Sequence, residues 1–381
     1  MILQTSWYIV PVVSLFVAII TVIPDLYARF KYRHTWIPVG SPPGMIGDDY
    51  HYFTLLNHLH RKLLNFLPGV TLTSVSFSAN SKFQLAGYIF NLIPFHIGFL
   101  LEDRRMGVLF VRIWNRFILG IASTNLAYLI ISHLGLPRTW LTAIACYLFF
   151  FVAYPGPFGI QTLQSIVFQT NNYRHIYERA NANDLTRAMF AETTAPILMI
   201  GMSFLILFLD LKNPLYLLLV TVSLGFLSFH YFPSALVLAL ITMVICFFLV
   251  HNYAILILLG MIISIYIVLY LYLVGKDEVG KEIFAHNDSG KIIKKFGKYD
   301  ILYFASIIIP YLLSNKLIQP DIIVQVIQVS LLFFLLSHFF YKHQISRFWD
   351  RAANILFQFI AATILVGLMS NNIENKFLSY I

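Results

Sequence analysis

Long runs of apolar residues alternate with short polar connections along most of this 381-residue chain. A helix needs about 20 residues to cross the hydrocarbon layer of a bilayer, and most of the runs reach or approach that length. The runs are continuous rather than alternating, so they predict helices and not membrane strands. We expect about eleven membrane segments, at residues 7–24, 84–101, 107–133, 139–153, 194–210, 213–229, 232–250, 252–274, 301–318, 321–341 and 352–370.

This pattern predicts an all-α polytopic membrane protein with three regions. Residues 1–274 would form a transmembrane module that contains a long polar loop at 25–83. Residues 275–300, rich in lysine and acidic side chains, would be a polar connector, and 301–381 would hold C-terminal membrane helices. The first segment lacks a basic leader, so we treat it as a retained helix rather than a signal peptide.

Composition supports the membrane assignment. The chain is 59% hydrophobic and 11% charged, with a mean hydropathy of +0.76, whereas soluble domains carry about 25% charged residues. The net charge of +9 is spread over the polar connections, which indicates the positive charge that orients membrane helices and not a nucleic-acid surface. Cys146 and Cys246 lie inside apolar segments, where we expect them to serve in packing.

Positive charge predicts a cytoplasmic N-terminus, because that orientation places most later Lys and Arg residues in cytoplasmic loops. Arg29, Lys31 and Arg33 follow the first segment and argue locally for the opposite orientation. The first loop is close to the length of about 60 residues at which the rule weakens. We therefore expect the loop 25–83 to face outside.

Two adjacent aspartates stand in this first loop, in the sequence Gly47-Asp48-Asp49-Tyr50-His51-Tyr52. One of them suits the cap of a helix that starts near Tyr50 and ends at Pro68-Gly69. Apolar residues at helical spacing predict that this helix lies in the membrane interface: Phe53, Leu56, Leu59 or Leu63, and Leu64. The polar residues assigned to its other faces are Asn57, His58, His60, Arg61 and Lys62.

Capping explains one aspartate better than two. A pair of carboxylates beside His51 can also bind a divalent cation or a sugar hydroxyl, or act as a general base. His51 and His58 are seven residues apart, two turns of a helix, so they are too distant to share one zinc ion. We interpret the histidines of this helix as residues of a solvated face.

Basic side chains in or near membrane segments are the other candidates. Arg112 and Arg116 lie four residues apart with Asn115 between them, and would either pair with Glu102 or Asp103 or contact an anionic head group. The cluster from Arg174 to Arg187 is either a solvated face or a phosphate site. His230 belongs to a turn between two segments.

Together these features resemble the GT-C class of integral-membrane glycosyltransferases. The resemblance rests on a first membrane segment, a long outer loop with an acidic pair, an interfacial helix and many further segments, over roughly residues 1–250. Arg187-Ala188-Met189-Phe190 followed by Pro196 is loosely similar to a segment in bacterial members. The chain is short for the class, and residues 154–193 fall on the cytoplasmic side, away from the aspartates.

The resemblance implies transfer of a sugar from a polyprenyl-phosphate donor to a surface-glycan or lipid-linked acceptor, at the outer face of a bacterial-type inner membrane. Asp48 or Asp49 would be the catalytic base, or would hold a divalent cation such as Mg²⁺ or Mn²⁺. The substrate-binding candidates are Tyr50, His51, Arg112, Arg116, Arg174 and Arg187. The partners would be membrane lipids, the lipid-linked donor and the acceptor, with no nucleic acid.

Three rival functions remain, and one of them is a non-catalytic assembly subunit in which the acidic pair would only cap a helix. A polymerase or ligase of lipid-linked glycans would still be a transferase. A flippase or other transporter of lipid-linked sugars would place ionisable groups deep in several segments, whereas this chain holds nearly all its charges in loops.

Overall fold

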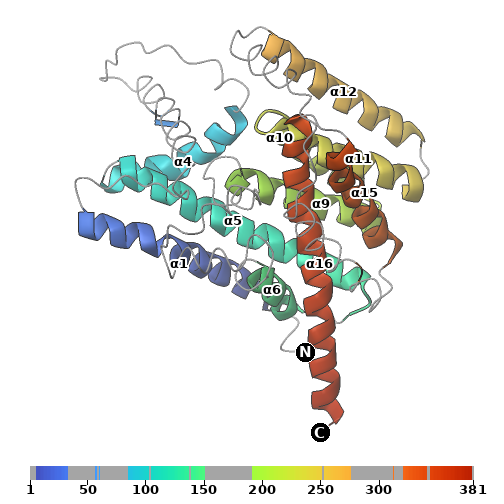
Figure 1. Ribbon diagram of the computed structural model, residues 1–381, viewed down its shortest axis with the longest axis horizontal. Coiled ribbons are helices and arrows are strands. Elements are labelled where there is room, and N and C mark those ends of the chain that lie inside the picture. Colours follow the sequence, from blue (N-terminus) through green and yellow to red (C-terminus); the bar gives the residue numbers. More distant parts are fainter. Residues whose placement is uncertain are drawn as a thin grey trace.

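The computed structural model of the chain is all-helical in the residues that it describes (Figure 1). These are residues 6–32, 56–57, 60, 85–102, 104–136, 139–150, 191–250, 253–275, 312, 321–340 and 344–379. Four helices are long and apolar enough to cross a membrane, at Arg105–His133, Thr193–Leu211, Phe232–Val250 and Ala254–Tyr272. The prediction of a helical membrane protein is confirmed at this level.

Each predicted apolar segment except 301–318, which lies outside the described residues but for one position, coincides with a helix of the structure. Several of these helices are shorter than a full crossing. The helices are α1 (Ile9–Tyr32, after a 3₁₀ turn at Ser6–Tyr8), α4 (Leu85–Leu101), α5 (Arg104–His133), α6 (Trp140–Leu148), α9 (Ala191–Leu211), α10 (Pro214–Ser228), α11 (Phe232–Ile245, continued by a π-helix at Cys246–Val250), α12 (Tyr253–Gly275), α15 (Ile322–Phe340) and α16 (Gln344–Ser379).

Capping side chains start the helices that follow two short turns. The α9–α10 turn contains Lys212 in the left-handed region, with a φ of 52°. Asn213 then caps α10 by accepting a hydrogen bond of 3.0 Å from the backbone N–H of Leu215, and Pro214 occupies the first turn. Thr139 caps α6 in the same way through the N–H of Thr142. The tight hairpin predicted at 210–213 is confirmed.

The first two helices run in the same direction. Val22 of α1 packs on Leu109 of α5, whereas Ser14 of α1 meets Gly120, so α1 is antiparallel to α5. Gly98 of α4 approaches Gly107 of α5 in the connecting hairpin, so α4 is also antiparallel to α5. Helices α1 and α4 are therefore parallel to each other (Figure 1). Helix α1 also extends to Tyr32, into the predicted loop.

This direction differs from the sequence-based expectation. A loop at 25–83 that leaves and re-enters the same membrane face would join two antiparallel helices. The parallel pair means that the connection between Tyr32 and Leu85 joins opposite ends of the two helices. Apolar periodicity locates helices but carries no information on the direction in which they pack. The parallel direction of α1 and α4 could therefore not be predicted from the sequence.

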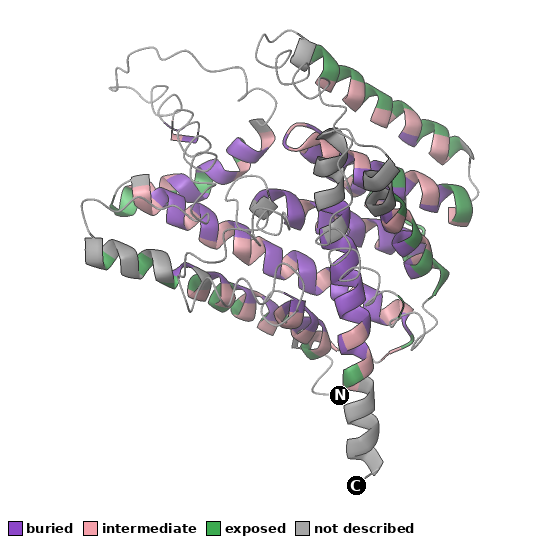
Figure 2. Cartoon of the chain, in the orientation of Figure 1, coloured by how far each residue is buried: buried purple, intermediate pink, exposed green. Residues whose placement is uncertain are grey.

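Exposed side chains on the outer helices are mostly apolar. Along α12, the exposed fraction of the residue reaches 63% at Ile257 and at Val268. Only 6% of the residues in the apolar stretch of this helix are buried inside the protein. Helix α1 exposes a stripe that includes Val12, Phe16 and Ile23 (Figure 2). Water would not favour such surfaces, and lipid chains do. Burial therefore agrees with an integral membrane protein.

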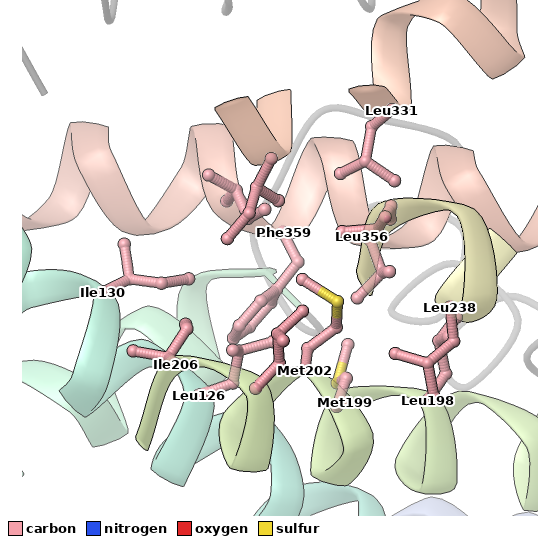
Figure 3. Close-up of a cluster of buried hydrophobic side chains, with 14 of the residues drawn as sticks. Leu126, Ile130, Leu198, Met199, Met202, Ile206, Leu238, Leu331, Leu356 and Phe359 are labelled. Atoms are coloured by element: carbon pink, nitrogen blue, oxygen red, sulfur yellow. The ribbon is translucent and has the colours of Figure 1, made fainter. Parts of the chain in front are cut away.

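One hydrophobic core joins helices from both halves of the chain (Figure 3). Leu126 and Ile130 of α5 meet Met202 of α9 close to Phe359 of α16, all within the same cluster. Helix α16 passes across α5 and α9 and is buried through its middle part (Figure 2). The C-terminal helices α15 and α16 thus share their core with α5, α6, α9, α10 and α11.

Three helix ends meet at His133, the last residue of α5. Its Nε2 lies 3.1 Å from Oδ1 of Asp210 on α9, and its Nδ1 lies 3.1 Å from Oδ2 of Asp321, which precedes α15. The backbone N–H of Asp321 also donates to the carbonyl of His133 at 3.3 Å. We call these three residues the His133 clamp. Because both carboxylates are partly exposed, its contribution to stability is modest.

Candidate functional site

Arg112 is buried in the middle of the bundle. Its side chain is 0% exposed, and among the described residues it is the only Lys, Arg, Asp or Glu that is buried. Leu109 and Ile113 of α5 pack toward α1, and Val108 and Val111 pack in the cluster shared with α4, so Arg112 stands between these two contacts. It lies eight residues into α5, about 12 Å along the axis. A cation is retained in such a place only when something stabilises its charge.

Arg116 follows one turn later on α5 and is half-buried. Its charge acts on the hydroxyl of Tyr147, a buried residue of α6. Glu102, one of the two acids expected to pair with these arginines, is exposed near the start of the α4–α5 hairpin, and Asp103 lies outside the described residues.

Buried polar side chains continue from α5 onto α4 and α9. Asn91 of α4 is 0% exposed, and its amide donates to Thr193 Oγ1 of α9 at 3.0 Å. Asn115 of α5 is also fully buried. Phe90 meets Trp114 with ring centroids 5.9 Å apart, which places Asn91 and Asn115 at the same level of the bundle. Asn91 and Thr193 thus lie near the level of Asn115, which is three residues from Arg112 on α5.

The segment that follows the acidic pair packs on these same helices. Leu56 is 0% exposed and belongs to a cluster with Tyr88 and Phe95 of α4 and Val108 and Val111 of α5. Leu56 was expected on the apolar face of an interfacial helix, and in the structure this residue packs against α4 and α5. Val111 is the neighbour of Arg112, so this contact brings the first loop close to the buried arginine.

His60 corrects one sequence-based interpretation. It was assigned to a solvated face, but it is 1% exposed, and its Nε2 lies 2.8 Å from Nδ1 of His96 on α4. Its ring also contacts Phe95 and Phe99 edge-on, at centroid distances of 5.2 and 5.0 Å. Leu56 and His60 are four residues apart, and that spacing puts them on one face of a helix. The position of His60 on the same face as Leu56 could therefore have been predicted from the helical spacing.

The arrangement suits an anionic ligand. A buried guanidinium offers several N–H donors in a fixed plane, and neighbouring amides and hydroxyls can complete the hydrogen bonds of phosphate oxygens. The described residues contain no group of three or more His, Cys, Asp or Glu side chains that could hold a metal ion. Arg112 and its polar neighbours are therefore a candidate phosphate site.

The other predicted site residues lie outside the described part of the chain: Asp48, Asp49, Tyr50, His51, Arg174 and Arg187. Their roles remain predictions. Sequence reasoning did not select Asn91, Thr193 or His96, because isolated polar residues in apolar segments have no motif. Their position inside otherwise apolar helices was the signal available.

Comparison with known proteins gives no match, neither to a protein-family model nor to a curated protein or a solved structure.

Proposed function

We propose that this chain is a GT-C-like membrane glycosyltransferase that moves a sugar from a polyprenyl-phosphate donor to a surface-glycan or lipid-linked acceptor. The proposal includes about eleven membrane crossings in a bacterial-type inner membrane and a catalytic face turned outward. Its support comes from the acidic pair in the first loop and from the buried arginine on α5.

The packing of Leu56 is the observation that carries the proposal. Leu56 is fixed against α4 and α5 beside Val111, and Asp49 precedes it by seven residues. Seven residues span at most about 25 Å even when fully extended. The acidic pair is therefore tethered within reach of the helix that carries Arg112.

These groups divide the chemistry between them. One carboxylate of the pair would take the proton from the acceptor hydroxyl, whose oxygen then attacks the anomeric carbon of the donor sugar. The bond between that carbon and the phosphate oxygen breaks, and the polyprenyl phosphate leaves as an anion. Arg112 would stabilise the developing negative charge. Alternatively, Asp48 and Asp49 would hold a divalent cation, which would add neutralisation at the same phosphate.

Single replacements of the two acids test this function in cells. Asp48→Asn and Asp49→Asn keep the size of each side chain and its ability to cap a helix, but they remove the base. We expect at least one of them to abolish the surface glycan in cells lacking the native gene, at unchanged protein level. Normal glycan with both variants would sink the enzymatic proposal.

A transporter of lipid-linked sugars is the second candidate, because buried polar side chains occur on several helices at once. Arg112, Asn91 and Thr193 lie on α5, α4 and α9, as the lining of a transport path would. A transporter would move the intact lipid-linked sugar across the bilayer, whereas a transferase would release its polyprenyl phosphate. That difference separates the two functions.

A further inference from the structure

The turn between α10 and α11 packs against the first turn of α4. The backbone N–H of Ala86 donates to the carbonyl of Phe229 at 3.3 Å. His230 is 3% exposed, and its ring lies directly on Gly87, where a Cβ atom would overlap the imidazole. This contact places the buried His230 beside α4, although the two are far apart in the sequence.

Several neutral polar groups lie at this level of the bundle. Asn91, one turn beyond Gly87, donates to the Gly87 carbonyl at 2.9 Å and to Thr193 of α9. Gly201 of α9 faces Ser223 of the antiparallel helix α10. Thr194 lies seven residues, or two turns, before Gly201 on α9. His230 lies seven residues after Ser223. The hairpin register therefore places Thr194 level with His230.

Two hydroxyl groups here are buried and make no hydrogen bond within the described part of the chain. Oγ1 of Thr194, on a side chain 5% exposed, is one, and Oγ of Ser234, on a residue 0% exposed at the start of α11, is the other. Nε1 of Trp114 on α5 is a third such atom. Buried polar atoms in native proteins nearly always have a partner, so such a group of orphans points to a bound ligand or water.

Aromatic rings adjoin the polar groups. Phe226 lies 5.9 Å from His230 and 5.8 Å from Phe90, and Phe90 lies 5.9 Å from Trp114, measured between ring centroids. The described side chains of this group are hydroxyl, amide, imidazole, indole and phenyl, and none of them is a carboxylate, amine or guanidinium. A neutral ligand with many hydroxyls and an apolar ring face matches such a lining, with few placed polar groups among apolar ones.

We propose that these residues form a binding site for the ring of a neutral sugar, built by Asn91, Trp114, Thr194, His230 and Ser234. Trp114 lies two residues beyond Arg112 on α5, a spacing that turns the two side chains to different faces of the helix. The assignment to the donor sugar rests on the function proposed above. The sugar site itself does not, because it requires no phosphate.

Thr194→Val tests the site, because valine keeps the shape of threonine and removes only the hydroxyl. The full-length protein is purified in a sugar-free zwitterionic detergent, and octyl glucoside, octyl galactoside and octyl mannoside are the probes. Binding is followed by native mass spectrometry. We expect the wild type to retain one molecule of at least one glycoside, with affinity lowered about tenfold by Thr194→Val and by Ser234→Ala.

Thr124→Val is the matched control. Thr124 is 0% exposed on α5, and its Oγ1 also makes no hydrogen bond within the described residues, but it lies nearly three turns beyond Trp114 along the helix. All three variants lose an unsatisfied buried hydroxyl, so none should lower the thermal stability of the ligand-free protein. Only Thr194→Val and Ser234→Ala should weaken glycoside binding.

The outcomes separate the two proposals. Absence of binding of every glycoside by the wild type, or equal affinity in wild type, Thr194→Val and Ser234→Ala, would overturn the sugar site. Glycoside binding that depends on Thr194 in a protein whose Asp48→Asn and Asp49→Asn variants still support normal glycan would retain the sugar site and reject the glycosyltransferase.

Discussion

Helices α5 and α12 are both long enough to cross a membrane, yet they are opposite in what they carry and where they lie. In the apolar stretch of α5, 56% of the residues are buried inside the protein. The helix also carries the polar residues Arg112, Asn115 and Arg116. In the apolar stretch of α12, only 6% of the residues are buried. Between Tyr253 and Gly275 this helix has no charged residue. Of the four candidate spans, α12 is the most apolar and α5 the least.

The difference shows how the bundle uses its surroundings. Lipid cannot hydrogen-bond, so a helix that faces lipid has to be apolar on nearly every side. A helix enclosed by other helices can keep polar and charged groups, because its neighbours solvate them. Helix α5 contacts α1, α4, α6, α9 and α16. The polar residues of α5 therefore mark the inside of the protein and the place for its chemistry.

Removing packing at the centre of the bundle should have the largest effect. Phe359 of α16 is 0% exposed in the shared core, so Phe359→Ala leaves a cavity and should cost about 3–5 kcal/mol of stability. Met261 of α12 is 53% exposed, and Met261→Ala should leave stability nearly unchanged. Thermal unfolding in detergent compares them. Equal losses at both positions would contradict the assignment of α12 to the periphery.

Removing the buried charge should have the next largest effect, and on binding rather than on folding. Arg112→Gln should weaken binding of a C55 polyprenyl phosphate by about 10- to 100-fold, because one charge-assisted hydrogen bond contributes about 1.5–3 kcal/mol. Arg112→Lys keeps the charge and should restore part of the loss. Ile265→Gln on the exposed face of α12 is the control. Unchanged lipid binding in Arg112→Gln would remove the phosphate site from the account.

Replacing two glycines by alanine should change the stability of the protein in opposite directions. A Cβ at Gly107 of α5 would lie 2.8 Å from the Phe95 carbonyl oxygen, so Gly107→Ala should cost about 1–3 kcal/mol. A Cβ at Gly260 of α12 would have nothing within 4 Å. Gly260→Ala should therefore stabilise the helix, by about 0.5–1 kcal/mol. Unfolding measurements that gave the same sign for both would show that α12 is packed as tightly as α5.

The His133 clamp should show the smallest effect. His133→Ala breaks the contacts with Asp210 and Asp321, and we expect a loss of about 1 kcal/mol, because both carboxylates are partly exposed. Asp210→Asn and Asp321→Asn should each give a smaller loss, and the combination with His133→Ala should add little to it. Fully additive losses in the double variants would mean that the three residues act independently.

Much of the helical architecture followed from the sequence. The tight α9–α10 turn was predicted from Asp210 to Asn213, and the span 84–101 was predicted almost to the residue. Both are local features, set by apolar length and by turn residues. The parallel direction of α1 and α4 was not predicted, because it depends on the contacts of Val22 with Leu109 and of Ser14 with Gly120, which no local pattern encodes.

The site was predictable in part. Arg112 could be selected because a charge inside an apolar segment is rare. Its complete burial, and the contact of His60 with His96, result from tertiary packing of the first loop on α4. Thr194 and Ser234 are ordinary in composition, and only the register of α9, α10 and α11 brings them level with His230.

The fate of a labelled donor tests the central claim most directly. Purified protein in vesicles receives a polyprenyl-phosphate sugar labelled in both the sugar and the lipid, together with an envelope extract as acceptor. The account predicts transfer of sugar label to the acceptor and release of polyprenyl phosphate, both lost in Arg112→Gln and in at least one of Asp48→Asn and Asp49→Asn. Movement of the intact donor across the bilayer, with no polyprenyl phosphate released, would contradict it and identify a transporter.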